Sequence, residues 1–312
     1  MPITRTTLLA GPATASFGGR TFVARDGILV TPALELEAVD SDAQGVLDAT
    51  ASLLPVRIQF TPQAGLKDLL ALYPFLEGEP GTPLFGASDV PLVLVAANGI
   101  RLTFSAAGLL QMPDLSLGAR GAATGDVVFL AMGARALPIT AVNRVVTIDT
   151  VDAPMLPVIT SHLADDYAIT WGNSTPWLDL RAREGIEVKF AMNWRPVLSA
   201  ANGLLDFTLD ALAVTVRFTP ASVEGPAESD VFAALQAQGA LPGRLLSQLA
   251  ETLTIAGEHL WVQLPLAQLS AGALTFDATH SRVGELTFTA TRAVLEAEEE
   301  LSGLATLTEG EP

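Results

Sequence analysis

Histidines are the residues in this chain best suited to metal binding or acid–base catalysis. There are three, His162, His259 and His280, and none has a second histidine at a spacing that would make a ligand pair. Zinc sites combine several His, Cys or carboxylate ligands, and the chain has no cysteine. His259 falls within an alternating strand pattern. We therefore predict no metal site and no cofactor.

Two acidic clusters could do chemistry. The segment Asp40–Gly45, with the sequence DSDAQG, resembles the start of a calcium-binding loop. Such a loop needs a glutamate at its twelfth position, which here is Ala51, so a turn is the better interpretation. The pair Asp165-Asp166 has no evident acid–base partner and is predicted to be a solvated turn.

No motif typical of an enzyme accompanies these residues. The chain has no phosphate-binding loop, dinucleotide-binding glycine pattern or nucleophile elbow. Trp171, Trp177, Trp194 and Trp261 all lie in the second half of the chain. Trp194 and Trp261 fall in strand patterns, which favours a place in the core or an interface over a ligand platform. We predict that the protein is not an enzyme and has no catalytic residues.

Composition excludes several classes of function. The chain has 312 residues, with 34 acidic and 17 basic side chains and a net charge of −17, so its field opposes tight nucleic-acid binding. Hydrophobic residues make up 49%, enough to build a core. The longest stretch without a charged residue, His259–Phe276, alternates in polarity and does not resemble a membrane-spanning helix. Since no secretory signal is recognisable at the N-terminus, we expect a soluble protein made in the cytoplasm.

An internal repeat organises the chain. Residues 27–62 align without a gap on residues 185–220, an offset of 158, and the strand that ends in Phe60-Thr61-Pro62 recurs ending in Phe218-Thr219-Pro220. Near the far end, Gly125 and Phe129 match Gly284 and Phe288 at an offset of 159. We infer a tandem duplication with two modules, residues 1–153 and 154–292, joined near the proline-containing segment 152–157. Residues 293–312 contain six acids and no base and are expected to form a separate, solvated acidic tail.

Each module is predicted to be mostly strand. Alternating residues predict a strand over 186–194 and its counterpart over 34–38, each followed by a turn that ends at Gly45 or Gly203. Leu66, Leu69, Leu70 and Tyr73 form a helical stripe that Pro74 ends, and the corresponding helical region 224–252 diverges. Asn98-Gly99 predicts a hairpin joining 91–96 to 100–104. The fold class is therefore mainly β (β+α): two tandem, similar β-sandwich or half-barrel modules with a flanking helix and long hairpins.

These ordered features resemble the major tail tube proteins of long-tailed bacteriophages, in the variety with two tandem modules. The residues that carry the resemblance run from about 20 to 292. They are Gly27-Ile28, Val39–Asp42 with Gly45, Val56–Pro62, Leu84–Gly86, Asp89–Val93, Leu102–Phe104, Gly125–Phe129, Tyr167–Gly172 and Arg282–Phe288.

The resemblance implies a structural virion protein. Its long hairpins would join an inner barrel, three chains would form a pseudo-hexameric ring, and stacked rings would form a conduit for the genome in the virion tail. It further implies contacts with tape measure, terminator and distal tail proteins, and viral DNA passing without specific binding. For the lumen wall we predict Glu35, Glu37, Glu187 and Lys189. Two alternatives stay open: a tube or hub component of another phage-like injection machine, and a two-module binding protein, for example for carbohydrate.

Overall fold

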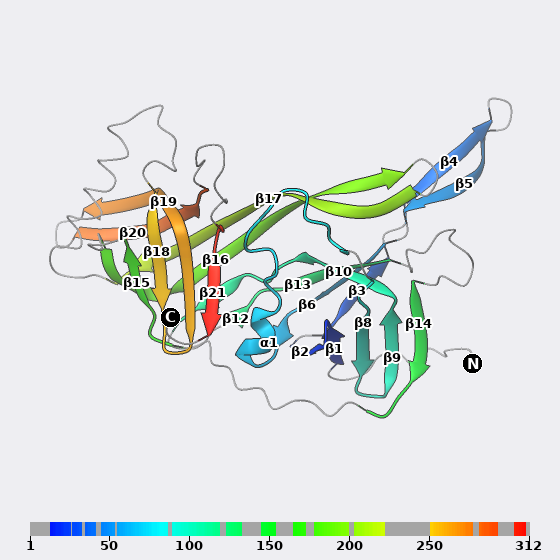
Figure 1. Cartoon of the computed structure of the whole chain (residues 1–312), viewed down its shortest axis with the longest axis horizontal. Helices are drawn as coiled ribbons and strands as arrows, with labels where there is room; N and C mark the ends of the chain where they lie inside the picture. The colour runs from blue at the N-terminus through cyan, green and yellow to red at the C-terminus, as the bar shows by residue number, and fades with distance from the viewer. Residues whose placement is uncertain are drawn as a thin grey trace.

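The structure is a computed structural model of the chain. It describes residues 13–25, 27–32, 35–41, 45–53, 55–86, 89–118, 123–132, 145–153, 165–172, 178–199, 203–221, 250–276, 281–292 and 303–309. Antiparallel strands dominate these residues, so the predicted mainly-β class is confirmed. Figure 1 shows an elongated molecule whose N-terminal half (residues 13–153) and C-terminal half (residues 165–309) lie towards opposite ends.

Two antiparallel sheets form the body of the N-terminal half. Six of its described strands form one sheet in the order β14-β9-β8-β1-β2-β7. Their bounds in that order are Val146–Thr150, Ile100–Phe104, Leu92–Ala96, Ala13–Phe17, Arg20–Ala24 and Pro62–Gln63. Four others form a sheet in the order β10-β13-β6-β3, with bounds Ala106–Gln111, Val127–Met132, Val56–Phe60 and Leu29–Pro32. The sheets share one core, in which Phe17 of β1 lies 4.8 Å from Phe129 of β13, measured between ring centroids.

Two short hairpins complete this half. Strands β4 (Glu35–Ser41) and β5 (Gly45–Leu53) pair only with each other among the described strands, and they project at one end of the molecule (Figure 1). Strands β11 (Leu115–Leu117) and β12 (Ala123–Thr124) form the other hairpin. The first hairpin contains the segment that resembled a calcium loop, whose residues 42–44 lie outside the described part of the chain.

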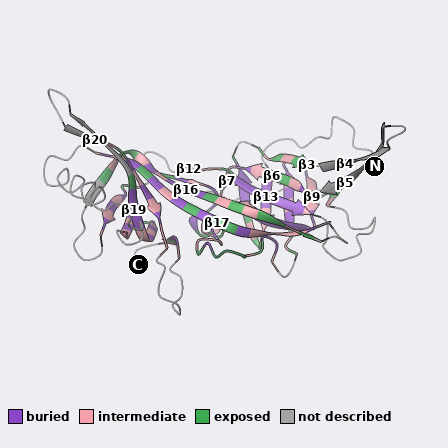
Figure 2. Cartoon of the chain, turned by 90° about the horizontal axis from the view of Figure 1, so that it is seen from above, coloured by how far each residue is buried: buried purple, intermediate pink, exposed green. Residues whose placement is uncertain are grey.

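Fewer and longer strands build the C-terminal half. They are β15 (Ala168–Trp171), β16 (Leu178–Ser199), β17 (Gly203–Pro220), β18 (Glu251–Ala256), β19 (Leu260–Phe276), β20 (Ser281–Ala290) and β21 (Thr306–Glu309). Their pairings run β16-β15-β18-β19-β20-β17 and return to β16, while β21 pairs with β19. The circuit closes because β16 and β19 are long enough to pair with different neighbours along their two ends. Along the β16–β17 hairpin, buried and more exposed residues alternate (Figure 2), as expected for strands with one face against a core.

Strand register is the same in both halves. Val30 pairs with Ile58, and 158 residues later Val188 pairs with Val216. The hairpin β4–β5 is offset by a bulge between Glu35 and Leu36, and β16–β17 has one between Asn193 and Trp194, again 158 residues later. A second pair of bulges, after positions 39 and 197, keeps the same spacing.

The outer strands agree as well. β1 pairs with β8 as β15 pairs with β18, and β14 covers the edge of β9 as β21 covers the edge of β19. Likewise β13 pairs with β6 as β20 pairs with β17. Each described strand pairing within the N-terminal half therefore has a counterpart in the C-terminal half, where β16 corresponds to β2, β3 and β4 in succession and β19 corresponds to β9, β10 and β11.

The same arrangement of aromatic rings lies at the centre of each half. Phe129 stacks on Phe60 with centroids 6.0 Å apart, and Phe288 stacks on Phe218 at 5.9 Å. A third ring tilts against each stack, Phe17 in the first half and Trp171 in the second. Phe129, Phe288 and Trp171 are at most 1% exposed, so these rings anchor each half within one continuous hydrophobic core.

The predicted helix is present but short. Helix α1 covers Leu66–Leu70, after which the chain continues in turns up to Pro74. Leu66, Leu69 and Tyr73 are buried as the stripe predicted. The corresponding helical region 224–252 lies outside the described residues up to position 249.

The C-terminal segment corrects an expectation. Residues 293–302 lie outside the described part, but Thr306–Glu309 form β21 and pair with Leu260–Gln263 of β19. Leu304 and Ala305 are buried, and the N–H of Leu304 donates to the carbonyl of Leu76. Residues 303–309 therefore belong to the fold of the C-terminal half rather than to a solvated tail, because Leu304 and Ala305 are buried in the core and Leu307 packs against it. Among the described helices, none is long and apolar enough to cross a membrane.

Candidate assembly interface

The residues that the sequence offers for possible chemistry do not form a common site among the described residues. His259 is exposed in the turn between β18 and β19 rather than in a strand, because β19 begins only at Leu260. His162 and His280 lie outside the described residues. Within the described ranges, no group of three His, Cys, Asp or Glu side chains could hold a metal ion.

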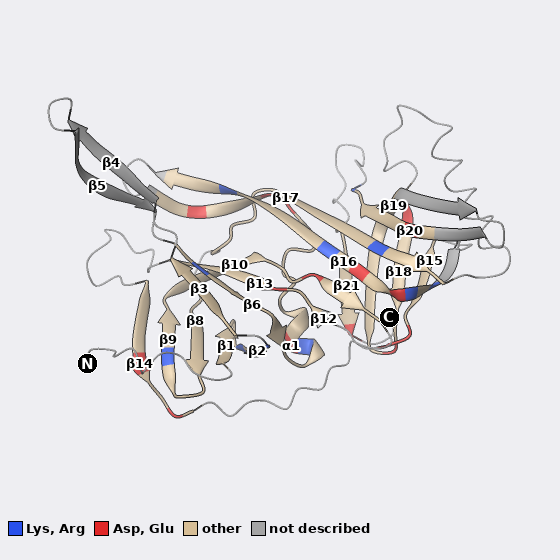
Figure 3. Cartoon of the chain, turned by 180° about the vertical axis from the view of Figure 1, so that it is seen from behind, with Lys and Arg blue, Asp and Glu red and all other residues tan. Residues whose placement is uncertain are grey.

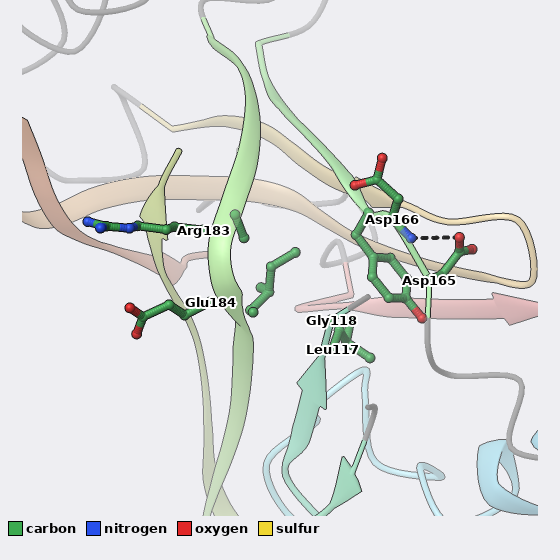
Figure 4. Close-up of a pocket in the computed structure, with 10 residues that line it drawn as sticks. Leu117, Gly118, Asp165, Asp166, Arg183 and Glu184 are labelled. Carbon is green, nitrogen blue, oxygen red and sulfur yellow. Dashed lines mark hydrogen bonds between the residues drawn. The ribbon is translucent and has the colours of Figure 1, made fainter. Parts of the chain in front are cut away.

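The pair Asp165-Asp166 lines a pocket of about 450 Å³ where the two halves meet. Figure 4 shows these carboxylates on one side of the pocket and Arg183 and Glu184 on the other. The Asp165 carboxylate accepts the N–H groups of Asp166, at 2.7 Å, and of Glu258. Asp166 forms an exposed ion pair with Arg181 at 3.1 Å. Both carboxylates are thus engaged in fixing the turn before β15, as the prediction of a turn required.

A strand of the N-terminal half continues the sheet of the C-terminal half. β11 pairs antiparallel with β16, and Leu115, Ser116 and Leu117 stand opposite Val188, Glu187 and Ile186. The other edge of β16 pairs with β17 at the same residues. One sheet therefore crosses from one half to the other.

Polar contacts hold the junction beside this pairing. Asp114 precedes β11 and its Oδ1 accepts the N–H of Phe190 in β16 at 3.0 Å. Burial raises the pKa of Asp114, and the hydrogen bond from Phe190 opposes that shift. On the buried side, the ring of Tyr73 packs against Phe190 across the junction with centroids 5.2 Å apart. Its hydroxyl donates to the carbonyl of Pro113 within the N-terminal half at 2.8 Å, and burial raises the pKa of Tyr73, so that this phenol stays neutral.

Trp194 joins the halves further along β16. Its Nε1–H donates to the carbonyl of Leu110 at 2.7 Å, and its ring meets Phe75 edge-on with centroids 5.2 Å apart. The expectation that Trp194 serves a core or an interface is therefore confirmed. Trp171 is buried and donates to the carbonyl of Ala267, whereas Trp177 lies outside the described residues.

A loop of the N-terminal half pairs with β17 around Thr208. The N–H of Leu84 donates to the carbonyl of Phe207, and that of Leu209 donates to the carbonyl of Thr82. The carboxylate of Asp206 accepts the N–H of Phe85 at 3.2 Å. Asp206 follows Asp48 by 158 residues, the offset of the sequence repeat, and this contact gives it a structural role at the junction.

Charged residues of both signs lie along the β16–β17 hairpin (Figure 3). Of the predicted wall residues, Glu187 and Lys189 lie two positions apart on β16 and form an ion pair of 3.0 Å. Arg195 pairs with Asp210 at 3.1 Å across the hairpin. Glu35 and Glu37 lie on β4, at register positions equivalent to Asn193 and Arg195. Arg217 is also exposed and stands opposite Glu187 in the register. With this base the β16–β17 stretch is close to neutral with a slight positive excess, and the acidic residues Glu35 and Glu37 of the hairpins come from the N-terminal half.

In the C-terminal half β16 pairs with β11 at the junction, whereas the corresponding strand edge of the N-terminal half is unpaired among the described strands. β3 corresponds to residues 187–190 of β16 by register, and it is the last strand of its sheet among the described residues. Leu29 on this edge is 60% exposed, one of the most exposed large hydrophobic residues of the described chain. An unpaired edge with an exposed leucine is a template for strand addition.

Comparison with known proteins does not place this architecture in a family: no protein-family model matches the chain, and no curated protein matches it.

Proposed function

We propose that this chain is the major subunit of a bacteriophage tail tube. In this proposal three chains form a ring of six sandwiches, and stacked rings form a conduit through which the genome leaves the virion. Tape measure, terminator and distal tail proteins would bind to the tube, and DNA would pass without specific binding.

The observation that carries the proposal is the junction within the chain. Two halves with the same strand order, register and bulges stand side by side, joined by a continuous antiparallel sheet through β11 and β16. A contact that joins unlike surfaces of two equivalent units can be repeated from one unit to the next, and it closes into a ring when the rotation permits. Closure would also cover the open edge of β3.

The hairpins supply a suitable lining. The exposed residues of β16–β17 include small side chains, such as Ala191 and Ala213, two ion pairs and the base Arg217. With Glu35 and Glu37 at the equivalent positions of β4, a wall made of both hairpins would be neutral to acidic. Such a wall would not retain DNA phosphates, because it offers no excess of positive charge.

The two alternative functions would use the same fold in a different assembly or for binding. A subunit of another phage-like injection machine would share the ring, and gene neighbourhood separates the two. A carbohydrate-binding protein would need exposed aromatic platforms, yet Trp171 is buried and Trp194 is engaged with Leu110 and Phe75.

Electron microscopy of the purified protein, together with light scattering after size-exclusion chromatography, tests the proposal. We expect rings with sixfold appearance and a mass three times the 32.6 kDa of the chain, or tubes built from such rings. A protein that remains monomeric at all concentrations, and in the presence of its tail partners, would rule out the proposed function.

A further inference from the structure

The edge of β3 matches a surface that is already paired elsewhere in the same chain. Residues Ile186–Val188 of β16 pair with β17 on one side and with β11 on the other. Their register equivalents, residues 28–30, pair with β6 on the corresponding side, and no described strand lies on the other side. The pairing of residues 28–30 with β6 thus repeats the pairing of residues 186–188 with β17. On the other edge, residues 186–188 pair with β11, whereas residues 28–30 have no partner among the described strands.

Glycines at the start of both edges support this equivalence. Gly185 and Gly27 are 158 residues apart, and both have positive φ, 124° and 98°. A Cβ on Gly185 would lie 3.0 Å from the carbonyl oxygen of Leu117 at the end of β11. On Gly27 a Cβ would meet no described atom within 4 Å. The conformation that lets β11 approach closely in the C-terminal half is therefore also present in the N-terminal half.

The strand equivalent to β11 lies at the far end of β19. Leu115 pairs with Thr124, and 159 residues later Leu274 pairs with Val283. Residues 274–276 therefore correspond to β11. They lie in the β19–β20 hairpin, at the end of the molecule opposite to the β4–β5 hairpin (Figure 1), so a chain cannot bring its own residues 274–276 to its own β3 without dismantling the junction.

We propose that residues 274–276 of one chain add as a strand to β3 of a second copy of this chain. The register follows from the internal junction: Leu274 stands opposite Val30, Thr275 opposite Leu29 and Phe276 opposite Ile28, in antiparallel orientation. The inference rests on the proposed ring in one respect, that repeating this contact joins three chains into the ring. Its backbone hydrogen bonds cover the open edge, and its occupant is a second copy because, among the described strands, residues 274–276 are the register equivalent of β11.

Cysteine cross-linking tests the register, and the chain suits it because it contains no cysteine. Two single variants, Leu29→Cys and Thr275→Cys, are purified separately and treated with an oxidant or a short bis-maleimide, alone and after mixing. Directly opposed residues in antiparallel strands are close enough for either linkage. We expect covalent dimers in the mixture, at least tenfold more than in either variant alone, with peptide mapping that joins positions 29 and 275.

An internal pair serves as the matched control. The double variant Ser116→Cys/Glu187→Cys places cysteines at the equivalent register within one chain and should cross-link in the monomer. Circular dichroism of each variant confirms that it is folded. The double variant Leu29→Cys/Thr275→Cys should give a covalent trimer.

The outcomes separate the two proposals. Rings in the microscope with no 29–275 linkage, while the internal pair links, would overturn the inference and leave the tube function standing. A 29–275 linkage in open filaments or other assemblies would support the strand addition and reject the trimeric ring. Linkage within either single variant alone would show a symmetric contact between identical edges and would also overturn the inference.

Discussion

Truncating Phe129 and Phe288 to alanine tests whether the two halves depend on equivalent cores. Both side chains are 0% exposed, and each stacks on a phenylalanine of the neighbouring strand, at 6.0 Å in the first half and 5.9 Å in the second. Replacing a fully buried phenylalanine by alanine costs about 3–5 kcal/mol, from lost transfer free energy and the cavity that remains. Because the surroundings match, we expect the two losses in the free energy of unfolding to agree within about 1 kcal/mol.

Urea unfolding followed by two signals measures these losses. All four tryptophans lie in the C-terminal half of the chain, and Trp194 also contacts Phe75 and Leu110 of the N-terminal half, so fluorescence reports mainly the C-terminal half while far-UV circular dichroism reports both. If the junction couples the halves, the two signals of the Phe129→Ala variant will shift together. Independent halves would shift the dichroism much more than the fluorescence. The control is Ile148→Ala, at a side chain that is 51% exposed, which should change stability by less than about 0.5 kcal/mol.

A cost above about 3 kcal/mol for one truncation and below about 1 kcal/mol for the other would contradict equivalent cores. In that case the shared register would not reflect a shared core.

Further variants address single contacts. Trp194→Phe removes the donor to the carbonyl of Leu110 and should lower the free energy of unfolding by about 1–2 kcal/mol in urea titrations. Gly99→Ala forces a positive φ of 78° and places a Cβ 2.2 Å from the carbonyl oxygen of Val151, so we expect a loss of at least about 2 kcal/mol by the same assay. Burial raises the pKa of Asp114 in the folded state. Protonation of this carboxyl group therefore increases the free energy of unfolding as the pH falls through the folded-state pKa. Asp114→Asn should therefore show a smaller rise in Tm than the wild type between pH 7 and pH 4.5 in scanning calorimetry.

Local patterns in the sequence were sufficient to predict several strands and turns. Alternation predicted the strands around Ile186 and Val56, and Asn98-Gly99 predicted the turn between β8 and β9, where Gly99 has positive φ. These signals are local, because side-chain alternation and turn chemistry depend on neighbouring residues. The helix was overestimated, since the stripe from Leu66 to Tyr73 indicates only which residues are buried, and the chain covers them with a short helix followed by turns.

Contacts between segments that are distant in the chain were harder to predict from the sequence. Leu115–Leu117 is too short to signal a strand, and its pairing with β16 depends on the arrangement of the two halves. The repetition of Asp48 as Asp206 was a usable signal, because an aspartate that both copies retain needs a reason, and Asp206 meets the loop at Phe85. β21 was missed because the acidic residues around it outweighed the pattern of Leu304 and Leu307.

The contact within the chain and the proposed contact between chains differ at two facing positions, and the two differences compensate each other. This comparison bears on how the proposed ring assembles. Within the chain, Asp114 accepts the N–H of Phe190. The register equivalent of Phe190 is Pro32, which has no N–H to donate, and the equivalent of Asp114 is Ala273. Donor and acceptor are thus absent together, so the proposed contact between chains leaves no buried carboxylate without a partner. It also has one polar contact fewer than the junction within the chain. We therefore expect the bond between chains to form after each chain has folded and to be the first to open when a ring dissociates.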